Sequence, residues 1–388
     1  MTQLLLPIIY LAFISLGLPD ALLGAAWPTM YPQLGAQVSW AGGVSMIISA
    51  CTILSALASD RLNERLGTGR VTAISVATTA AALLGFSFCH AFWQLCLWAI
   101  PYGLGAGSVD AALNNYVALH YKSRHMSWLH CMWGVGASLG PVIMGQALAG
   151  SGWQGGYRII GILQVVLTVV LLFSLPLWKL PQDPMGGEPF TPQHRSFPEL
   201  LKITGVPEVL VCFLCYCALE STAGMWASSY CTLVRGLDAQ TAASWASLFY
   251  LGITAGRFVS GFLTMKMSDR NMIRLGQVLI ALGILLVLLP AGNNVLFVGL
   301  ILIGLGCAPV YPCIIHETPV NFGRELSMSM TGLQMAFAYV GSCLAPPLFG
   351  LLAQNVTPRL YPWYLAVGLV VMVIMSESLH AKKAAEHR

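Results

Sequence analysis

Twelve long apolar stretches, separated by short polar segments, follow one another along the 388-residue chain. A helix needs about 20 mostly apolar residues to cross a bilayer, whereas a transmembrane strand would be about ten residues long with alternating polarity. The alternating pattern is absent. The predicted spans are roughly 4–27, 38–58, 70–89, 92–120, 127–149, 157–178, 206–231, 242–264, 272–290, 295–316, 326–353 and 361–379. The sequence therefore predicts an all-α integral membrane protein with twelve transmembrane helices.

The Lys and Arg residues between the spans are distributed unevenly. Fifteen lie in the even-numbered loops and the C-terminal tail, against three in the odd-numbered loops, Arg158, Arg235 and Arg359. Cytoplasmic loops carry the excess of Lys and Arg, so both termini are predicted to be cytoplasmic, in a multi-pass protein of the cell (inner) membrane. The first span has neither a basic segment before it nor a cleavage site, which favours a retained helix over a signal peptide.

The composition narrows the class of protein further. Hydrophobic residues make up 57% of the chain and charged residues 9%, with a mean hydropathy of +0.73, whereas a soluble domain carries about 25% charged residues. The net charge is +4, and the basic residues form no stripe that could hold a phosphate backbone. A soluble enzyme and a nucleic-acid binder are excluded. The expected partners are the lipid bilayer and a small-molecule substrate, and we expect a monomer.

No metal or cofactor site is predicted. The eleven cysteines lie mostly singly in apolar stretches. Cys212, Cys215 and Cys217 cluster, but no second Cys or His pair accompanies them to complete four ligands, so they are interpreted as small apolar core residues. No nucleophile–base constellation appears either, and the chain is not expected to be an enzyme.

The longest connection, residues 179–204, is rich in proline and is predicted to be a cytoplasmic linker between two six-helix halves, 1–178 and 205–388. Several motifs recur in the same order in both halves, which indicates an internal duplication. The matches are Asp20-x-x-x-Gly24 with Glu220-x-x-x-Gly224, Gly103-Leu-Gly105 with Gly304-Leu-Gly306, and the segment Gly136 to Pro141 with the segment Gly341 to Pro346. Transporters built from such repeats bind substrate near the bilayer midplane where the repeats meet, and we expect the same here.

This 6+6 arrangement resembles the major facilitator superfamily. The segment Ala56-Leu-Ala-Ser-Asp60-Arg61, followed by Arg65, is similar to the loop signature of that superfamily, although Asn63 replaces a glycine. The second copy is weaker, with Met265 at the aspartate position. In the signature the Asp and Arg lock the cytoplasmic gate, which the resemblance implies for Asp60 and Arg61.

Four ionisable residues stand well inside predicted spans: Asp20, Asp110, Glu220 and Arg257. Such residues are costly in lipid and face a cavity or a partner, so the three acids are candidate proton-coupling sites. The alternative is a structural carboxylate held between helices. Arg257 is grouped with the gating residues, and its interpretation stays open between pairing with a cavity acid and reaching the cytoplasmic surface.

Within the superfamily, the helix 4 motif resembles the fucose–proton symporter branch, which includes bacterial glucose/galactose carriers. Asp110 and Asn114 share one helix face, Asp20 lies in the first helix, and His130 precedes a glycine-rich fifth helix. In that branch the helix 1 aspartate and the helix 4 acid are implicated in substrate binding and proton coupling, which would carry over to Asp20 and Asp110. Two residues depart from the pattern of the branch: the helix 4 acid is Asp rather than Glu, and Asn115 replaces a proline.

The polar and aromatic residues of the spans suggest a neutral solute, most simply a sugar. Apart from Arg257 and His130 the spans offer no cation, and an anionic substrate would need a basic clamp. The candidate substrate-binding residues are Asp20, Asn114, His130, Trp133, Trp226, Gln334 and Tyr339, with Trp27, Tyr250 and Tyr311 as further options. Helix packing explains many such aromatic residues equally well. The expected function is proton-coupled sugar symport, with sodium open as the coupling ion. A proton-coupled exporter of drugs or metabolites is the alternative, and a membrane sensor is disfavoured because no soluble output domain is predicted.

Overall fold

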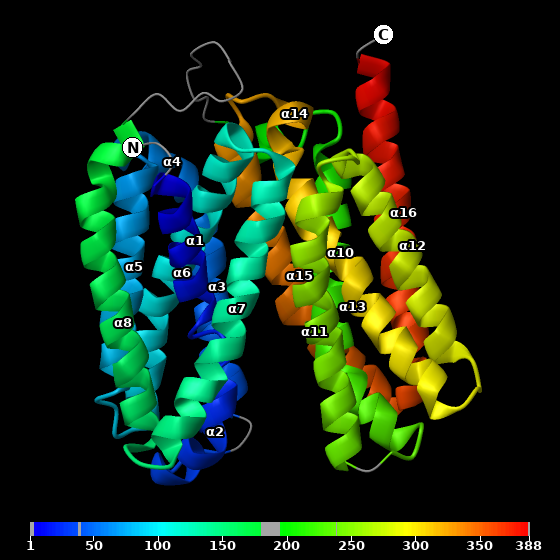
Figure 1. Cartoon of the computed structure of the whole chain (residues 1–388), viewed down its shortest axis with the longest axis horizontal. Helices are drawn as coiled ribbons and strands as arrows, with labels where there is room; N and C mark the ends of the chain where they lie inside the picture. Colours follow the sequence, from blue (N-terminus) through cyan, green and yellow to red (C-terminus); the bar gives the residue numbers. More distant parts are fainter. Residues whose placement is uncertain (1–3, 38–39, 180–194, 238, 387–388) are drawn as a thin grey trace. The chain divides into compact units, whose positions relative to one another are not determined.

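The computed structural model describes residues 4–37, 40–179, 195–237 and 239–386, and these residues form helices and connecting turns without strands. The first long helix is broken into α1 (Leu5–Gly17) and α2 (Leu22–Gln33). The other eleven long helices are α3 (Trp40–Leu57), α5 (Thr68–Phe86), α6 (Phe92–His120), α7 (Ser123–Leu148), α8 (Gly152–Ser174), α10 (Val206–Leu233), α11 (Ala239–Leu263), α12 (Asp269–Leu288), α13 (Asn293–His316), α15 (Ser327–Asn355) and α16 (Tyr361–Glu386). The prediction of an all-α chain with twelve long helices is confirmed (Figure 1).

Ten of the described helices are long and apolar enough to cross a membrane by length and composition. The two long helices outside this set are α6, which carries the polar stretch from Ser108 to Asn115, and α11, whose apolar part is Leu248–Leu263. The short elements are α4 (Ser59–Leu66), η2 (Leu175–Lys179), α9 (Phe197–Leu200), α14 (Thr318–Phe322) and η3 (Pro358–Leu360). In α4, Asp60 lies in the first turn and Arg65 in the last, which suits the helix dipole.

The chain divides into two compact units. Unit 1 comprises Met1–Tyr121, Trp128–His194 and Arg324–Ala336, and unit 2 comprises Lys122–Ser127, Arg195–Gly323 and Phe337–Arg388. The main division falls inside the predicted linker 179–204, of which residues 180–194 lie outside the described part of the chain. Residues 122–127 are grouped with unit 2, although the rest of α7 belongs to unit 1. Residues 324–336 are grouped with unit 1, although the rest of α15 belongs to unit 2. The prediction of two contiguous halves did not include this exchange.

The glycines of the duplicated motifs make equivalent contacts in each unit. In unit 1, a Cβ on Gly136 of α7 would overlap the backbone of Ile14 in α1, and a Cβ on Gly103 of α6 would overlap that of Ile48 in α3. In unit 2, Gly341 of α15 meets α10 at Leu214, and Gly304 of α13 meets α11 at Phe249. Small residues allow helix backbones to approach this closely. The repeated glycines therefore reflect one packing scheme used twice.

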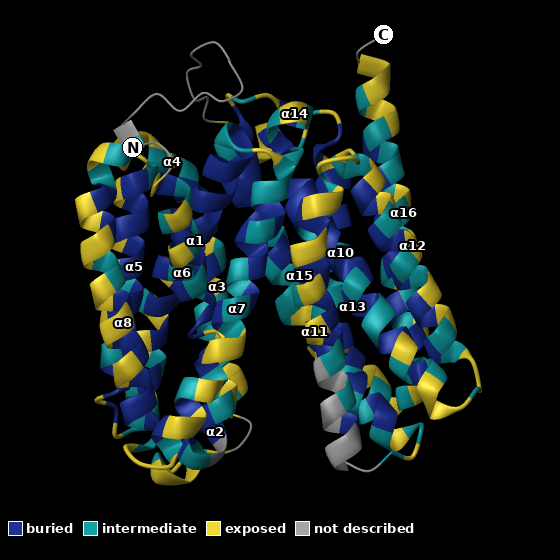
Figure 2. Ribbon diagram, viewed as in Figure 1, coloured by how far each residue is buried: buried dark blue, intermediate teal, exposed yellow. Residues whose placement is uncertain are grey.

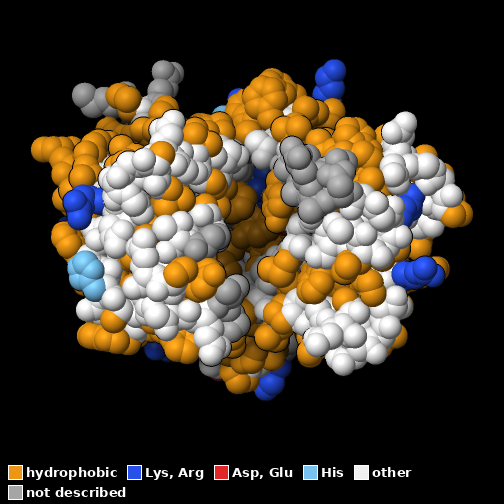
Figure 3. All heavy atoms as spheres, turned by 90° about the horizontal axis from the view of Figure 1, so that it is seen from below, with side chains coloured by type: hydrophobic (Ala, Val, Ile, Leu, Met, Phe, Trp, Pro, Cys, Tyr) orange, Lys and Arg blue, Asp and Glu red, His pale blue; other side chains and the backbone are white. Residues whose placement is uncertain are grey.

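The exposed faces of the peripheral helices are apolar. The exposed residues on the outward side of α8 are Ile159, Ile162, Leu163, Val165, Val166, Val169, Val170, Leu172 and Phe173. The exposed residues of α12 include Val278, Leu282 and Leu285 (Figure 2). Figure 3 shows the molecule from below, at the ends of the helices, where hydrophobic side chains are mixed with other side chains and backbone, and Lys and Arg are few and scattered. The exposed apolar faces of the peripheral helices are suited to lipid rather than water.

Candidate functional site

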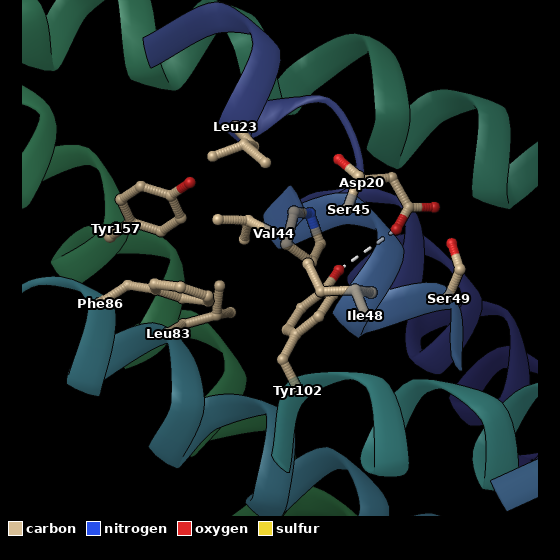
Figure 4. Close-up of a pocket in the computed structure, with 11 residues that line it drawn as sticks. Asp20, Leu23, Val44, Ser45, Ile48, Ser49, Leu83, Phe86, Tyr102 and Tyr157 are labelled. Carbon is tan, nitrogen blue, oxygen red and sulfur yellow. Dashed lines mark hydrogen bonds between the residues drawn. The ribbon is translucent and has the colours of Figure 1, made fainter. Parts of the chain in front are cut away.

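Asp20 lies at the break between α1 and α2. Pro19 has no backbone N–H to continue the helical pattern, and the chain turns through Leu18–Ala21 before the helix resumes. The phenol of Tyr102 donates to Asp20 Oδ1 at 3.2 Å (Figure 4). The indole Nε1 of Trp133 donates to Oδ2 at 2.8 Å. Asp20 forms no ion pair with any described residue, so two neutral donors hold this carboxylate in place.

A second acid forms a buried chain of hydrogen bonds in unit 1. Asn114 Nδ2 donates to Asp110 Oδ1 at 2.8 Å, and Asn114 Oδ1 lies 2.9 Å from His130 Nε2. Because the amide oxygen accepts only, Nε2 carries the proton in this contact. Asp110 is 6% exposed, Asn114 0% and His130 5%. The structure thus brings together three of the residues predicted to bind substrate or couple protons.

Residues of α6 and α7 make the hydrogen bonds to both Asp20 and the Asp110–Asn114 pair. His130 and Trp133 stand one turn apart on α7, the first directed to Asn114 and the second to Asp20. On α6, Tyr102, Asp110 and Asn114 belong to one row at four-residue intervals. Sequence reasoning missed Tyr102, although its place in this row was a signal that could have found it.

A cavity opens beside Asp20 within unit 1. Its volume is about 150 Å³, and its walls come from the helix break, α3, α5, α6 and α8. The polar residues that line it are Asp20, Ser45, Ser49, Tyr102 and Tyr157. None of the described residues that line it is basic. Ser45, Ser49 and Tyr157 carried no functional signal in the sequence, because serines and tyrosines are common in apolar helices.

Glu220, the duplicate of Asp20, has a charged partner in unit 2. Arg257 on α11 donates through Nη2 to Glu220 Oε1 on α10 at 3.3 Å, and the two side chains are 4% and 19% exposed. Of the two interpretations left open for Arg257, the structure places it against an acid. The duplicated position therefore carries an acid in both units, but only Glu220 of unit 2 is paired with a cation.

Breaking this pair is expected to be costly. Glu220→Gln leaves the Arg257 charge buried, and the loss of one partner of a buried pair typically costs about 3–5 kcal/mol. The matched control is Glu377→Gln, because Glu377 pairs with Arg270 and Arg274 on α12 while 38% exposed, and exposed pairs contribute about 0–1 kcal/mol. Thermal unfolding of the purified protein should show a much larger fall in Tm for Glu220→Gln. Equal shifts would contradict the buried pair.

The other predicted substrate residues have varied surroundings. Trp226 Nε1 donates to the carbonyl of Pro346 at 3.0 Å, and its ring packs on Phe349 at 5.2 Å, so the indole joins α10 to α15. Gln334 is fully buried and Tyr339 half-buried, both on α15. Of the further options, Trp27 is buried against Tyr31 and Phe92, Tyr311 packs on Phe213 and Tyr216, and Tyr250 is exposed. For these residues a role in binding stays a prediction.

The two residues of the loop signature differ in their contacts. Asp60 Oδ2 accepts a hydrogen bond from Ser329 Oγ at 3.0 Å, within unit 1, and Oδ1 accepts one from the backbone N–H of Arg61 at 2.6 Å. The Arg61 side chain is exposed. Asp60 thus ties α4 to the first turn of α15. A gating role for both residues, and for Arg257, stays a prediction.

Asp60→Asn is expected to change the transport rate more than substrate affinity. The amide keeps the size of the side chain but weakens the bond from Ser329, and substrate affinity should stay within about fivefold because one hydrogen bond contributes ~1 kcal/mol. Ser329→Ala is the matched variant and should have the same effect, with little further change in the double variant. Uptake rates in proteoliposomes and binding to purified protein provide the two readouts. Complete loss of binding in a folded Asp60→Asn protein would refute the assignment.

Unit 2 contains a second group of polar contacts that the sequence did not suggest. At the junction of α13 and α14, His316 Nδ1 lies 2.6 Å from Asp269 Oδ2, and Glu317 Oε2 lies 3.2 Å from His380 Nε2. The hydroxyl of Ser123 also donates to Asp269. These contacts join the ends of α12, α13 and α16 to the first turn of α7. Among the described residues, no group of three or more His, Cys, Asp or Glu side chains is arranged to hold a metal ion.

The model of the Major Facilitator Superfamily matches this chain over residues 9–246 and again over 210–386. The chain belongs to the major facilitator superfamily. It is therefore a multi-pass membrane transporter rather than an enzyme, and it acts on a small-molecule substrate. The resemblance inferred from the sequence is confirmed at this level, and the twelve long helices agree with the family architecture.

Solved structures share the fold. The structure of the superfamily transporter FucP in the outward conformation has a TM-score of 0.77 and covers 96% of this chain and 97% of its own, at 14% identity. A structure of the Escherichia coli fucose:proton symporter FucP has a TM-score of 0.75 at 16% identity, covering 97% of each chain. That of the human organic anion transporter MFSD10 reaches 0.73 at 14% identity, covering 97% of this chain and 99% of its own.

Curated relatives carry diverse names. A probable nitrate/nitrite antiporter, NarK1 of Thermus thermophilus, is 26% identical over 84% of this chain and 82% of its own length. The membrane sensor protein UhpC of Escherichia coli is 24% identical over 75% of this chain and 71% of its own. At these identities the names point to different substrates and roles, so the choice of substrate rests on the site.

Proposed function

We propose that this superfamily member is a proton-coupled symporter of a small neutral solute, with a sugar as the favoured substrate, in the cell membrane with both termini cytoplasmic. The observation that carries the proposal is the state of Asp20. This carboxylate stands in a helix break within a membrane span and is held by two neutral donors without an ion pair to any described residue. Asp20 is exposed in this structure. A charged carboxylate is costly in a dry site, so closure of the protein around Asp20 requires that it take up a proton or keep water.

Asp110 provides a second place for the proton. It is buried and linked through Asn114 to His130, and α6 and α7 connect this chain of hydrogen bonds to the Asp20 site. Protonation of either acid removes the cost of burying a charge, which would favour the closed and dry intermediate of alternating access. We assign proton coupling to Asp110 and Asp20 in this scheme, and solute binding to Asp20, Asn114, His130 and Trp133. Glu220 is assigned to neutralising Arg257.

The charges favour a neutral solute. Arg257 is paired with Glu220, so an anionic substrate would have to displace that carboxylate before using the cation. Around Asp20 the donors are hydroxyl and indole groups, which hydrogen-bond to hydroxyls of a sugar, and aromatic rings offer faces to its apolar side. An organic cation would also be attracted by Asp20 and Asp110, which is why a proton-coupled exporter is the second candidate.

Transport by purified protein in proteoliposomes tests the proposal. An inward proton gradient should drive accumulation of at least one labelled aldohexose above its external concentration, and a protonophore should abolish it. Replacing Na⁺ by choline should have no effect if the proton is the coupling ion. Transport of organic cations against a proton gradient, with no hexose uptake, would favour the exporter. Uptake of nitrate or organic anions instead would refute a neutral substrate.

A further inference from the structure

The helix break at Pro19 leaves one backbone carbonyl of α1 without its helical donor. In an unbroken helix the carbonyl of Ser15 would accept a hydrogen bond from the backbone N–H of residue 19, and proline has no N–H. The N–H of Asp20, the next along the chain, donates to the carbonyl of Gly17 instead. Ser15 is only 6% exposed, and a buried carbonyl without a donor destabilises the fold. This carbonyl therefore requires a donor from another helix.

A glutamine of α8 supplies that donor. Gln164 Nε2 donates to the carbonyl oxygen of Ser15 at 2.5 Å, and Gln164 is 1% exposed. The hydroxyl of Thr79 on α5 lies 3.5 Å from the amide oxygen, so the amide lies between α1 and α5. An amide brings a donor into an apolar helix interface without adding a charge. Gln164 therefore replaces, across the interface between α1 and α8, the hydrogen bond that Pro19 removes.

The same end of α1 also packs on α7. A Cβ on Gly17 would overlap the carbonyl oxygen of Trp133, so no side chain separates the two backbones here. Trp133 is also the residue whose indole donates to Asp20, while Tyr102 of α6 donates to the other carboxylate oxygen. The direction in which the chain leaves α1 therefore sets the distance from Asp20 to both donors. Contacts with α7 and α8 fix that direction from two sides.

The matching helix of unit 2 has no break. Alignment of Glu220 with Asp20 places Leu219 at the position of Pro19. Leu219 has a backbone N–H, and α10 continues unbroken through this residue. The helical pattern therefore provides a donor for the carbonyl of Cys215, which matches the unpaired carbonyl of α1.

The position of Gln164 is taken by a glycine in unit 2. Gly368 of α16 lies beside the matching turn, since a Cβ added there would be 3.9 Å from the carbonyl oxygen of Cys215 and 3.8 Å from Leu219 Cβ. A broken helix thus occurs with a glutamine in unit 1, and an unbroken helix occurs with a glycine in unit 2. This difference indicates that the amide serves the break rather than the general packing of α8.

We infer that Gln164 is a positioning residue, which fixes the helix break and thereby the place of Asp20. It acts through the carbonyl of Ser15 and makes no printed contact with the carboxylate itself. The inference rests on the proposed function for the role of Asp20 in proton coupling, whereas the position of Asp20 can be tested without a substrate.

A double-mutant cycle between Gln164 and Pro19, in the purified full-length chain, tests the hydrogen bond. Gln164→Met removes the donor at similar side-chain length and should lower Tm. Pro19→Ala provides a backbone N–H for the same carbonyl, so in that background Gln164→Met should lower Tm by less than half as much. Gln277→Met is the matched control, because Gln277 on α12 is 5% exposed and its Nε2 makes no hydrogen bond to a described residue. It should change Tm little.

Infrared spectra of the same proteins test the position of the carboxyl group. Difference spectra between acid and neutral pH contain the carboxyl band of Asp20, which is assigned by its loss in Asp20→Asn. The frequency of this band depends on the hydrogen bonds of the carboxyl group. Gln164→Met should therefore shift the band, and Gln277→Met should leave it in place.

The outcomes separate the inference from the proposed function. An equal fall in Tm with and without Pro19→Ala would show that Gln164 only packs, and an unshifted Asp20 band would show that it does not position the carboxylate; either result overturns the inference. If Gln164→Met yields no folded protein, adding Pro19→Ala should recover it, and failure to do so also overturns the inference. If both readouts agree with expectation but the wild type accumulates no hexose in proteoliposomes, the proposed function fails and the positioning role stands.

Discussion

Asp110→Asn is expected to abolish accumulation of substrate driven by a proton gradient while retaining exchange of labelled for unlabelled substrate. The substituted side chain is permanently neutral, so it cannot release a proton, whereas exchange needs no net proton movement. In the wild type, Asn114 Nδ2 donates to a carboxylate oxygen of Asp110. The amide oxygen that the variant introduces can accept the same hydrogen bond. The fold and the link to His130 should therefore survive. Proteoliposomes with an imposed pH gradient, followed by counterflow without one, measure the two modes.

Asp60→Asn is the matched control, because it makes the same chemical change in unit 1 near the start of α4. It should still concentrate substrate, at an altered rate. If Asp110→Asn also concentrates substrate, Asp110 is not the coupling site. If both transport modes vanish in a folded Asp110→Asn protein, its role is in binding, and coupling has to be sought at Asp20 or Glu220. Asp20→Asn is less informative, since one amide oxygen cannot replace both acceptors of the Tyr102 and Trp133 bonds.

Gly136→Ala and Gly341→Ala are expected to lower the yield of folded protein and its Tm by similar amounts. In each case the new Cβ would overlap a backbone carbonyl oxygen, of Ile14 in α1 or of Leu214 in α10, and a backbone can give way only by moving a helix. Overpacking typically costs about 1–3 kcal/mol and occasionally more. Thermal unfolding of detergent-purified protein, together with the monodisperse fraction on size exclusion, measures the effect.

Gly145→Ala is the control in the same helix as Gly136. A Cβ at Gly145 would meet no described atom of another helix within 4 Å. The substitution should therefore be neutral or slightly stabilising, because alanine favours helix over glycine. A Gly136→Ala protein as stable as Gly145→Ala would show that α1 and α7 do not approach as closely as described. A marked difference between Gly136→Ala and Gly341→Ala would show that the two units do not share one packing scheme.

The duplicated acids show how one repeat can acquire two chemistries. Asp20 and Glu220 occupy matching places in the two units, and Trp133 and Tyr102 hold the first while Arg257 holds the second. An acid held by neutral donors can change its protonation at modest cost, whereas an acid paired with a buried arginine is kept charged by its partner. Under the proposed function, this asymmetry places proton coupling in unit 1, while unit 2 holds the Glu220–Arg257 ion pair.

Much of this protein could be predicted from the sequence because the relevant signals are local. A membrane span depends only on a run of apolar residues long enough to cross lipid, so the twelve helices could be predicted from local sequence. The duplication was readable because glycines that allow helices to touch must recur at matching places. The acids were conspicuous because lipid tolerates them poorly.

The partners of those residues were decided only by tertiary structure. Whether Arg257 contacts Glu220, or Trp133 contacts Asp20, depends on how each helix is rotated about its axis and which helices pack beside it. The local sequence does not determine these two properties. The same holds for Gln164, whose role depends on the α1 carbonyl beside which α8 places its amide. The apolar pattern was sufficient to predict the helices because each residue's transfer into lipid depends mainly on that residue. The Asp20 site depends instead on hydrogen bonds to residues 82 and 113 positions away in the sequence.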